Sequence, residues 1–235
     1  MSLKWENPLS KTLSWSGEIK NRSEKEKLAQ TISTRALSGD IIGVGSGSTS
    51  LLALEAIGRR VQEESLKVMA VPTSQESALN CLYYGIPITA LTSARPDWGF
   101  DGADEVDDQG NLIKGRGGAL FAEKLVMASS PKTYILADKS KLVQHLGEKS
   151  FVPVEIDPRA VHLVENLMIK EFQPELIQLR MAEAKDGPVI TESGNILLDV
   201  KFNTIHYKMD KDIKALPGVI ETGLFFDYKV EILTS

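Results

Sequence analysis

A short apolar run that ends in a glycine-rich loop constrains the fold of this chain more than any other feature. The run covers residues 41–45, and the loop at 43–49 holds three glycines and three hydroxyl side chains. The run is typical of a buried strand, and apolar residues recur at helical spacing from residue 51. We therefore expect a strand, a tight turn and a helix, with Ser48 or Thr49 as the helix cap.

This alternation of strands and helices continues to residue 137. Further strands are expected at 67–71, 86–91, 98–100 and 133–137. Further helices are expected at 18–38, 74–84 and 119–128. Strands that alternate with helices favour a parallel sheet with helices on both faces.

After Gly147 the order of the elements changes. Strands are expected at 151–156, 176–182, 195–202 and 219–225, and helices at 159–169 and 210–216. The order β-α-β-β-α-β is that of a ferredoxin-like unit. The sequence predicts an α/β protein with a Rossmann-like parallel-sheet domain, residues 1–147 plus 227–235, and a smaller ferredoxin-like α+β domain, residues 148–226.

Composition and charge argue against several classes of function. No apolar run approaches the ~20 residues of a membrane helix. A net charge of −5 provides no basic field for nucleic acid. The single cysteine, Cys81, and three scattered histidines cannot form a Cys/His zinc site. We expect no membrane or nucleic-acid partner and no metal or cofactor, and the lone cysteine points to a reducing, cytoplasmic compartment.

The glycine loop has the chemistry of a phosphate site. Glycines let an anion approach the backbone, and the start of the following helix offers N–H groups and a positive dipole end. Ser46, Ser48 and Thr49 add hydroxyl donors around Gly47. The loop matches neither a Walker loop nor a dinucleotide fingerprint. The alternative is a plain strand-to-helix turn, but the three hydroxyls favour phosphate.

An acidic segment follows the strand expected at 98–100. Residues 101–108 hold five carboxylates at the sheet edge where α/β proteins bind ligands. Clustered carboxylates raise one another's pKa and can hold a proton near neutrality. A solvated loop explains the last two aspartates well, but it explains Asp101 and Asp104 less well, since they flank two small residues. The spacing of a calcium loop is missing.

A lysine and a glutamate complete the candidate set. Lys114 leads into a turn rich in glycine, and Glu123 lies about one turn into the helix that follows. Taken singly, each is more simply a surface residue. Together with Asp101 and Asp104 they supply what proton transfer through an enediol needs, which is a carboxylate base and a cation for the oxyanion.

Segments 43–49, 101–107 and 111–124 closely resemble the type A ribose-5-phosphate isomerase family, and 191–195 and 217–225 are also similar to it. The resemblance implies metal-free interconversion of D-ribose 5-phosphate and D-ribulose 5-phosphate in the pentose phosphate pathway, by a dimer or tetramer. It implies that Glu123 shuttles the proton between C1 and C2 and that Lys114 supports the enediolate. Asp101 and Asp104 would serve ring opening and hydroxyl proton transfer.

The same resemblance implies a set of residues that bind the sugar phosphate. Positions that match the family's phosphate ligands are Lys25, Ser48, Thr49 and Lys141. The rest of the predicted binding set lies in the loops beside them, at Ser46, Gly47, Thr73, Ser74, Gly115, Gly117 and Gly118.

Arg116 is the clearest departure from the family pattern, which has glycine there. Because the candidate catalytic set is intact, we expect Arg116 to adopt negative φ and to turn its guanidinium outward, toward a carboxylate of the acidic segment.

Two other functions fit the sequence less well. A sugar-phosphate sensor would not need Glu123. An amino-sugar phosphate deaminase-isomerase usually uses a histidine, which residues 43–123 lack. Both comparisons favour the isomerase.

Overall fold

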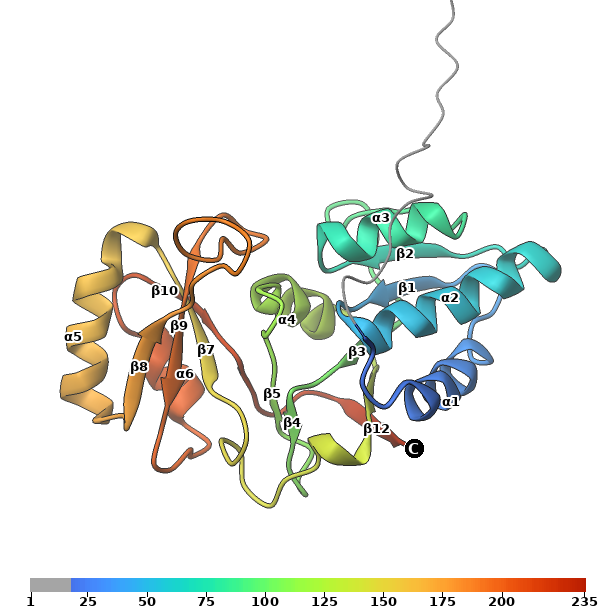
Figure 1. Cartoon of the computed structure of the whole chain (residues 1–235). Helices are drawn as coiled ribbons and strands as arrows, with labels where there is room; N and C mark the ends of the chain where they lie inside the picture. The colour runs from blue at the N-terminus through green and yellow to red at the C-terminus, as the bar shows by residue number, and fades with distance from the viewer. Residues whose placement is uncertain (1–17) are drawn as a thin grey trace, which may run out of the picture.

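The computed structural model describes residues 18–235, and its first layer is a five-stranded parallel sheet (Figure 1). The strand order is β12-β6-β3-β1-β2, and every pair of neighbours is parallel. The strands are β1 (Ile41–Val44), β2 (Met69–Pro72), β3 (Trp98–Gly102), β6 (Thr133–Ala137) and β12 (Val230–Thr234). This architecture confirms the α/β, Rossmann-like prediction.

Helices cover both faces of the parallel sheet. They are α1 (Arg22–Ser33), α2 (Ser48–Glu63), α3 (Gln75–Tyr83) and α4 (Leu120–Ser129). Along β6, Tyr134 and Leu136 belong to the core that includes α1 and α2, whereas Ile135 packs with Met127 of α4. Successive side chains of a strand point to opposite faces, so α1 and α2 lie on one face and α4 on the other.

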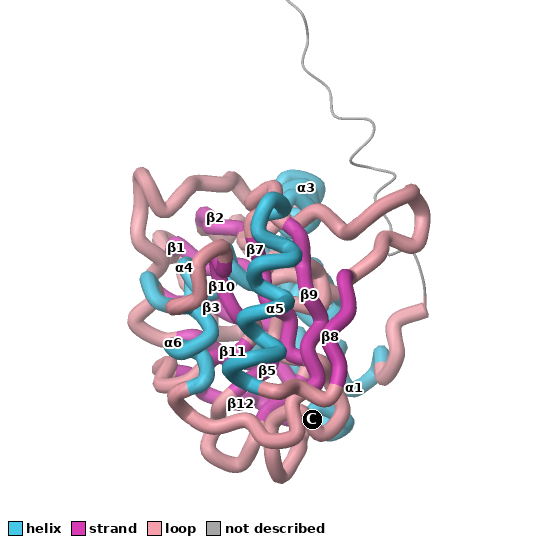
Figure 2. The backbone as a smooth tube through the Cα atoms, turned by 90° about the vertical axis from the view of Figure 1, so that its left-hand side faces the viewer, coloured by secondary structure: helices cyan, strands magenta, loops and turns pink. Residues whose placement is uncertain are grey.

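The second large sheet is antiparallel, with the strand order β10-β7-β9-β8. Its strands are β7 (Val152–Ile156), β8 (Leu176–Leu179), β9 (Ile196–Lys201) and β10 (Val219–Thr222). Two helices accompany them, α5 (Val161–Phe172) and α6 (Met209–Lys214), and Figure 2 shows α5 lying across this sheet. The ferredoxin-like prediction is confirmed. The predicted domain boundaries stay a prediction, and their residues 1–17 lie outside the described residues.

A small third sheet lies between the two large ones. It consists of β4 (Glu105–Val106), β5 (Leu112–Ile113) and β11 (Leu224–Phe225), with β5 in the centre. Leu112 and Phe225 pack into the core beneath the parallel sheet, whereas Ile113 and Leu224 pack into the core of the antiparallel sheet. One ribbon thus contributes side chains to two cores.

Gly223 explains why the strand predicted at 219–225 is divided between two sheets. A Cβ on Gly223 would lie 2.3 Å from the carbonyl oxygen of Lys114 and 2.6 Å from Pro153. The chain therefore passes from β10 to β11 at a point where only glycine fits. Its carbonyl accepts the Lys114 N–H at 3.0 Å, which ties Lys114 to this crossing.

Three local predictions are wrong. Residues 86–91 form no strand, because Pro87 lacks an N–H and only Ile88 bridges to β2. Helix α1 ends at Ser33, where the N–H groups of Arg35 and Ala36 bond three residues back. The N-cap of α2 is Gly47, with φ 89°, rather than Ser48 or Thr49. Within the described residues no helix is long and apolar enough to cross a membrane.

Candidate active site

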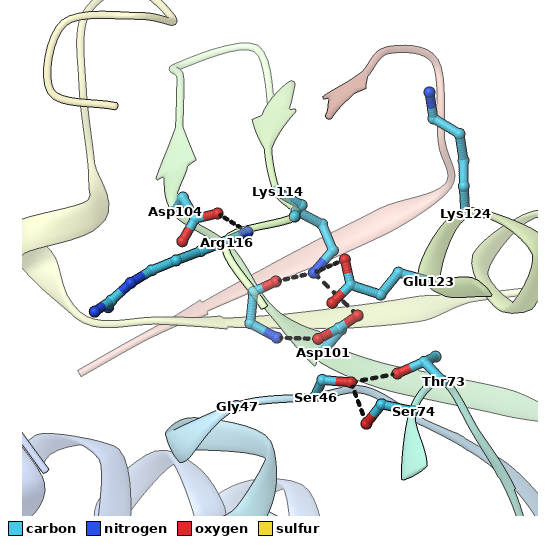
Figure 3. Close-up of polar contacts among 12 residues, drawn as sticks. Ser46, Gly47, Thr73, Ser74, Asp101, Asp104, Lys114, Arg116, Glu123 and Lys124 are labelled. Carbon is cyan, nitrogen blue, oxygen red and sulfur yellow. Dashed lines mark hydrogen bonds and ion pairs between the residues drawn. The ribbon is translucent and has the colours of Figure 1, made fainter. Parts of the chain in front are cut away.

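The candidate site lies where the parallel strands end (Figure 3). Ser46 follows β1, Thr73 follows β2, and Asp101 is the fourth of the five residues of β3. Lys114 directly follows β5, and Glu123 lies in the first turn of α4. The carboxyl edge of a parallel sheet is where α/β proteins bind ligands. Five segments that are separate in the sequence thus meet at this edge.

Asp101, Lys114 and Glu123 form a buried cluster. The Lys114 Nζ atom lies 3.0 Å from Asp101 Oδ2 and 3.3 Å from Glu123 Oε2, and it donates a hydrogen bond to the Gly102 carbonyl at 2.6 Å. The three side chains are between 3% and 6% exposed. One ammonium group faces two carboxylates, so a second cation or a proton is needed for charge balance.

Burial controls the titration of this cluster. It raises the pKa of Glu123 to about 8; the charge of Lys114 opposes this rise, while Asp101 and Asp104 add to it. Burial also raises the pKa of Asp101, again against the charge of Lys114. For Lys114, burial lowers the pKa, but the two carboxylates outweigh it and the pKa stands above its ordinary value. Lys114 therefore stays charged at neutral pH, whereas the pKa of Glu123 lies close to neutral pH.

Gly45 makes room for Asp101. A Cβ at residue 45 would lie 2.1 Å from the carboxyl carbon of Asp101. The Gly45 N–H also bonds to the Phe100 carbonyl at 2.9 Å, which draws the loop close to β3. The glycine loop by itself predicts only a phosphate site. No local pattern indicates the steric role of Gly45, because Asp101 is distant in the sequence.

Asp104 lies beside the cluster rather than inside it. It is half-buried, and its Oδ2 atom accepts the backbone N–H of Arg116 at 3.1 Å. Arg116 itself is exposed, and the residues with positive φ do not include it, as predicted. Gly115 and Gly118 adopt the left-handed conformation instead, with φ 104° and 78°. Gly117 is exposed at the tip of this turn.

The outward direction of Arg116 is confirmed, but its predicted ion pair is wrong. The guanidinium points away from Glu123 and Lys114 (Figure 3). Among residues 18–235 it forms no salt bridge with any carboxylate. The contact with the acidic segment is made by the Arg116 main chain instead, whose N–H bonds to Asp104.

The predicted phosphate residues surround the start of α2 in two groups. In one, the buried Lys25 of α1 donates to Ser48 Oγ at 3.0 Å. Burial lowers the pKa of Lys25, Asp138 opposes this, and the nearby charges of Lys141 and Arg116 lower it further. Thr49 lies in the first turn of α2, next to Ser48.

The second group is a chain of hydroxyls. Ser46 Oγ lies 2.8 Å from Thr73 Oγ1 and 2.8 Å from Ser74 Oγ. Ser74 also caps α3 by accepting the Ser77 N–H. Lys141 stands apart from both groups in a short 3-10 helix (Lys139–Lys141) that is half-exposed, and no hydrogen bond joins it to them within the described residues.

Two carboxylates outside the predicted set support these loops. Glu76 accepts the Gly47 N–H at 3.2 Å and the Asn80 amide at 2.8 Å, and burial raises its pKa. The fully buried Glu105 accepts the N–H groups of Gly147 and Lys149, each at 2.6 Å, and so holds the segment that follows Lys141. Both bind main-chain atoms, and no side-chain pattern in the sequence marks such contacts.

Comparison with known proteins agrees with this geometry. The sequence model of a family described as ribose 5-phosphate isomerase A (phosphoriboisomerase A) matches residues 69–235. Ribose-5-phosphate isomerase A of Synechococcus sp. is 44% identical over 206 residues, which cover 86% of this chain and 88% of that protein. The ribose 5-phosphate isomerase A structure from Methanocaldococcus jannaschii has a TM-score of 0.87 and 38% identity, over 92% of this chain and 95% of that one.

A second solved structure is a D-ribose-5-phosphate isomerase in complex with phospho-erythronic acid. It has a TM-score of 0.83 and 36% identity, and the match covers 89% of this chain and 94% of that one. Sequence and structure lead to the same assignment. The chain belongs to the ribose 5-phosphate isomerase A family.

Proposed function

We propose that this protein interconverts D-ribose 5-phosphate and D-ribulose 5-phosphate through an enediolate, with Glu123 as the base that acts on carbon. The observation that carries the proposal is the buried position of Lys114 between Asp101 and Glu123. An ammonium group held there can stabilise the oxyanion that forms at C1 or C2, in surroundings where water does not weaken the interaction.

The proton transfer follows from the properties of Glu123. Its carboxylate takes the proton from C2 of the open aldose and returns it to C1, while the proton of the C2 hydroxyl moves to the C1 oxygen. A base that also serves as an acid works best when its pKa is close to the working pH, and burial raises the pKa of Glu123 to about 8. Glu123 Oε2 lies 3.3 Å from Lys114 Nζ, and among residues 18–235 no other donor bonds to it.

Asp101 and Asp104 are suited to the oxygen atoms of the sugar. Asp101 lies 3.0 Å from Lys114 Nζ, beside Glu123, and burial raises its pKa. We assign ring opening and the transfer between hydroxyls to these two aspartates. Asp104 is half-buried at the edge of the cluster, where it accepts the Arg116 N–H.

The substrate phosphate would bind at the start of α2. Lys25 and Lys141 supply positive charge there, and Ser46, Ser48 and Thr49 supply hydroxyls close to the helix N-terminus. Gly47 at the N-cap, and the turn at 115–118, let the ligand approach the backbone. The Thr73-Ser74 hydroxyls complete this set. The proposal extends to the pentose phosphate pathway, a cytoplasmic location and a homodimer or homotetramer.

A coupled assay of ribulose 5-phosphate formation from ribose 5-phosphate tests the function. The wild type should turn over, before and after exhaustive treatment with EDTA. Glu123→Gln keeps the shape and removes the base, so kcat should fall by roughly 10²–10⁴-fold. Glu63→Gln, at an exposed glutamate on α2, is the matched control and should retain full activity. A Glu123→Gln variant that keeps more than about a third of the turnover would refute the assignment of the base.

A further inference from the structure

Arg180 connects the antiparallel sheet to the catalytic turn. It directly follows β8 and bonds through its own N–H to the Leu197 carbonyl of β9 at 2.9 Å. Its guanidinium crosses to the turn after Lys114, where Nη1 donates to the carbonyls of Gly115 at 2.9 Å and Arg116 at 2.8 Å. A side chain anchored in one sheet thus holds the backbone next to a residue of the site.

Asp199 fixes the guanidinium in place. Arg180 Nε donates to Asp199 Oδ2 at 2.8 Å, and Nη2 pairs with Asp199 Oδ1. The two side chains are 16% and 12% exposed. A bidentate pair of this kind sets the plane and the direction of the guanidinium, which lysine could not reproduce.

The turn is held on several sides at once. Gly118 bonds back to the Gly115 carbonyl at 3.1 Å, and the Glu192 N–H, also from the antiparallel-sheet region, bonds to the Gly118 carbonyl at 3.2 Å. The Arg116 N–H bonds to Asp104. Because Gly115 and Gly118 are flexible residues in left-handed conformations, these external contacts determine the path of the turn.

We propose that Arg180, oriented by Asp199, is a positioning residue for the isomerase reaction: it fixes the turn that sets the distance between Lys114 and Glu123. Arg180 contacts only main-chain carbonyls of the turn, and so acts on the reaction through the placement of Lys114. The inference rests on the isomerase function proposed above. It gives the ferredoxin-like region an indirect part in catalysis, through the position of Lys114.

Arg180→Ala tests this role. We expect kcat to fall by about 10-fold to 100-fold, since displacements near 1 Å have such effects. KM should rise less than kcat falls, because only the turn at 115–118 is disturbed while the phosphate residues Lys25, Ser48 and Thr49 lie on other segments. The acid limb of the kcat–pH profile should move to higher pH, since a loosened turn separates Lys114 from Glu123. Guanidinium ion, added well below denaturing concentrations, should restore part of the lost kcat.

Three further variants and the wild type make the outcomes distinct. Arg159→Ala removes an exposed arginine that pairs with Asp157 in the same region, and should change nothing. Arg180→Lys and Asp199→Asn keep most of the packing. If Arg180→Ala does not fold, the kcat, KM and pH profile of these two variants test the role of Arg180 instead. Folded variants with wild-type kcat and pH profile would overturn the role of Arg180. A wild type without turnover would instead overturn the function.

Discussion

Replacing Lys114 with methionine tests the electrostatics of the site most directly. The substitution keeps the length of the side chain and removes the only ammonium group in contact with Asp101 and Glu123 among the described residues. Two effects should follow. The oxyanion loses its stabilising charge, and ionised Glu123 loses its partner, so its pKa should rise above about 8.

The distance determines the scale of the second effect. For 3.3 Å between Lys114 Nζ and Glu123 Oε2, an effective dielectric constant of ~20 gives about 5 kcal/mol. That corresponds to an upper limit of about three to four pH units. Asp101, 3.0 Å from the same ammonium, also gains a proton when Lys114 is lost and then repels Glu123 less. We therefore expect the acid limb to rise by about one to two pH units.

The assay is the pH profile of kcat/KM for ribose 5-phosphate. The variant should lose about 10²–10³-fold in kcat, the usual loss for one oxyanion donor, and its acid limb should lie at higher pH. Lys124→Met is the matched control, because Lys124 is equally buried but pairs with Asp210 and Glu221 and points away from Glu123 (Figure 3). An acid limb that coincides with that of the wild type would refute the assigned coupling.

Three other substitutions give sharp expectations. Lys141→Ala should raise KM for ribose 5-phosphate more than it lowers kcat, because a phosphate contact is similar in ground and transition states; an unchanged KM would count against the site. Arg116→Gly should leave kcat/KM within roughly fivefold, since the exposed guanidinium forms no ion pair among the described residues, and a hundredfold loss would make Arg116 a substrate ligand. Gly45→Ala should abolish turnover because its Cβ would displace the Asp101 carboxyl group, and normal activity with an unchanged melting temperature would contradict the assigned contact.

Much of the fold could be predicted because its elements have clear local patterns. The buried strands, and the order of elements after residue 147, are indicated by patterns among residues that are close together in the sequence. The edges of the parallel sheet could not be predicted in this way. Residues 86–91 are apolar enough for a strand, but Pro87 interrupts the ladder. Residues 230–234 pair with the distant strand β6, with the whole antiparallel sheet between them in the sequence, and their short, charge-interrupted pattern does not indicate a parallel strand.

Some residues of the site could likewise be predicted from local patterns, and others could not. Asp101, Lys114 and Glu123 could be proposed because their residue types and short spacing suggest one chemistry. Lys25 entered only through the family resemblance, since nothing near it in the sequence indicates that it reaches Ser48. Arg180 could not be found at all, because its contacts in the catalytic turn are backbone carbonyls and its partner Asp199 lies on a different strand.

The ribbon of β4, β5 and β11 has a consequence for motion. The two large sheets are not joined by a single linker, because β5 and β11 pair at Ile113 and Leu224, and the Lys114 N–H bonds to Gly223 beside them. A hinge rotation between the sheets would break these bonds and expose Ile113 and Leu224, which are fully buried. We therefore expect substrate entry and product release to depend on small movements of the surface loops, while the two large sheets keep their relative positions.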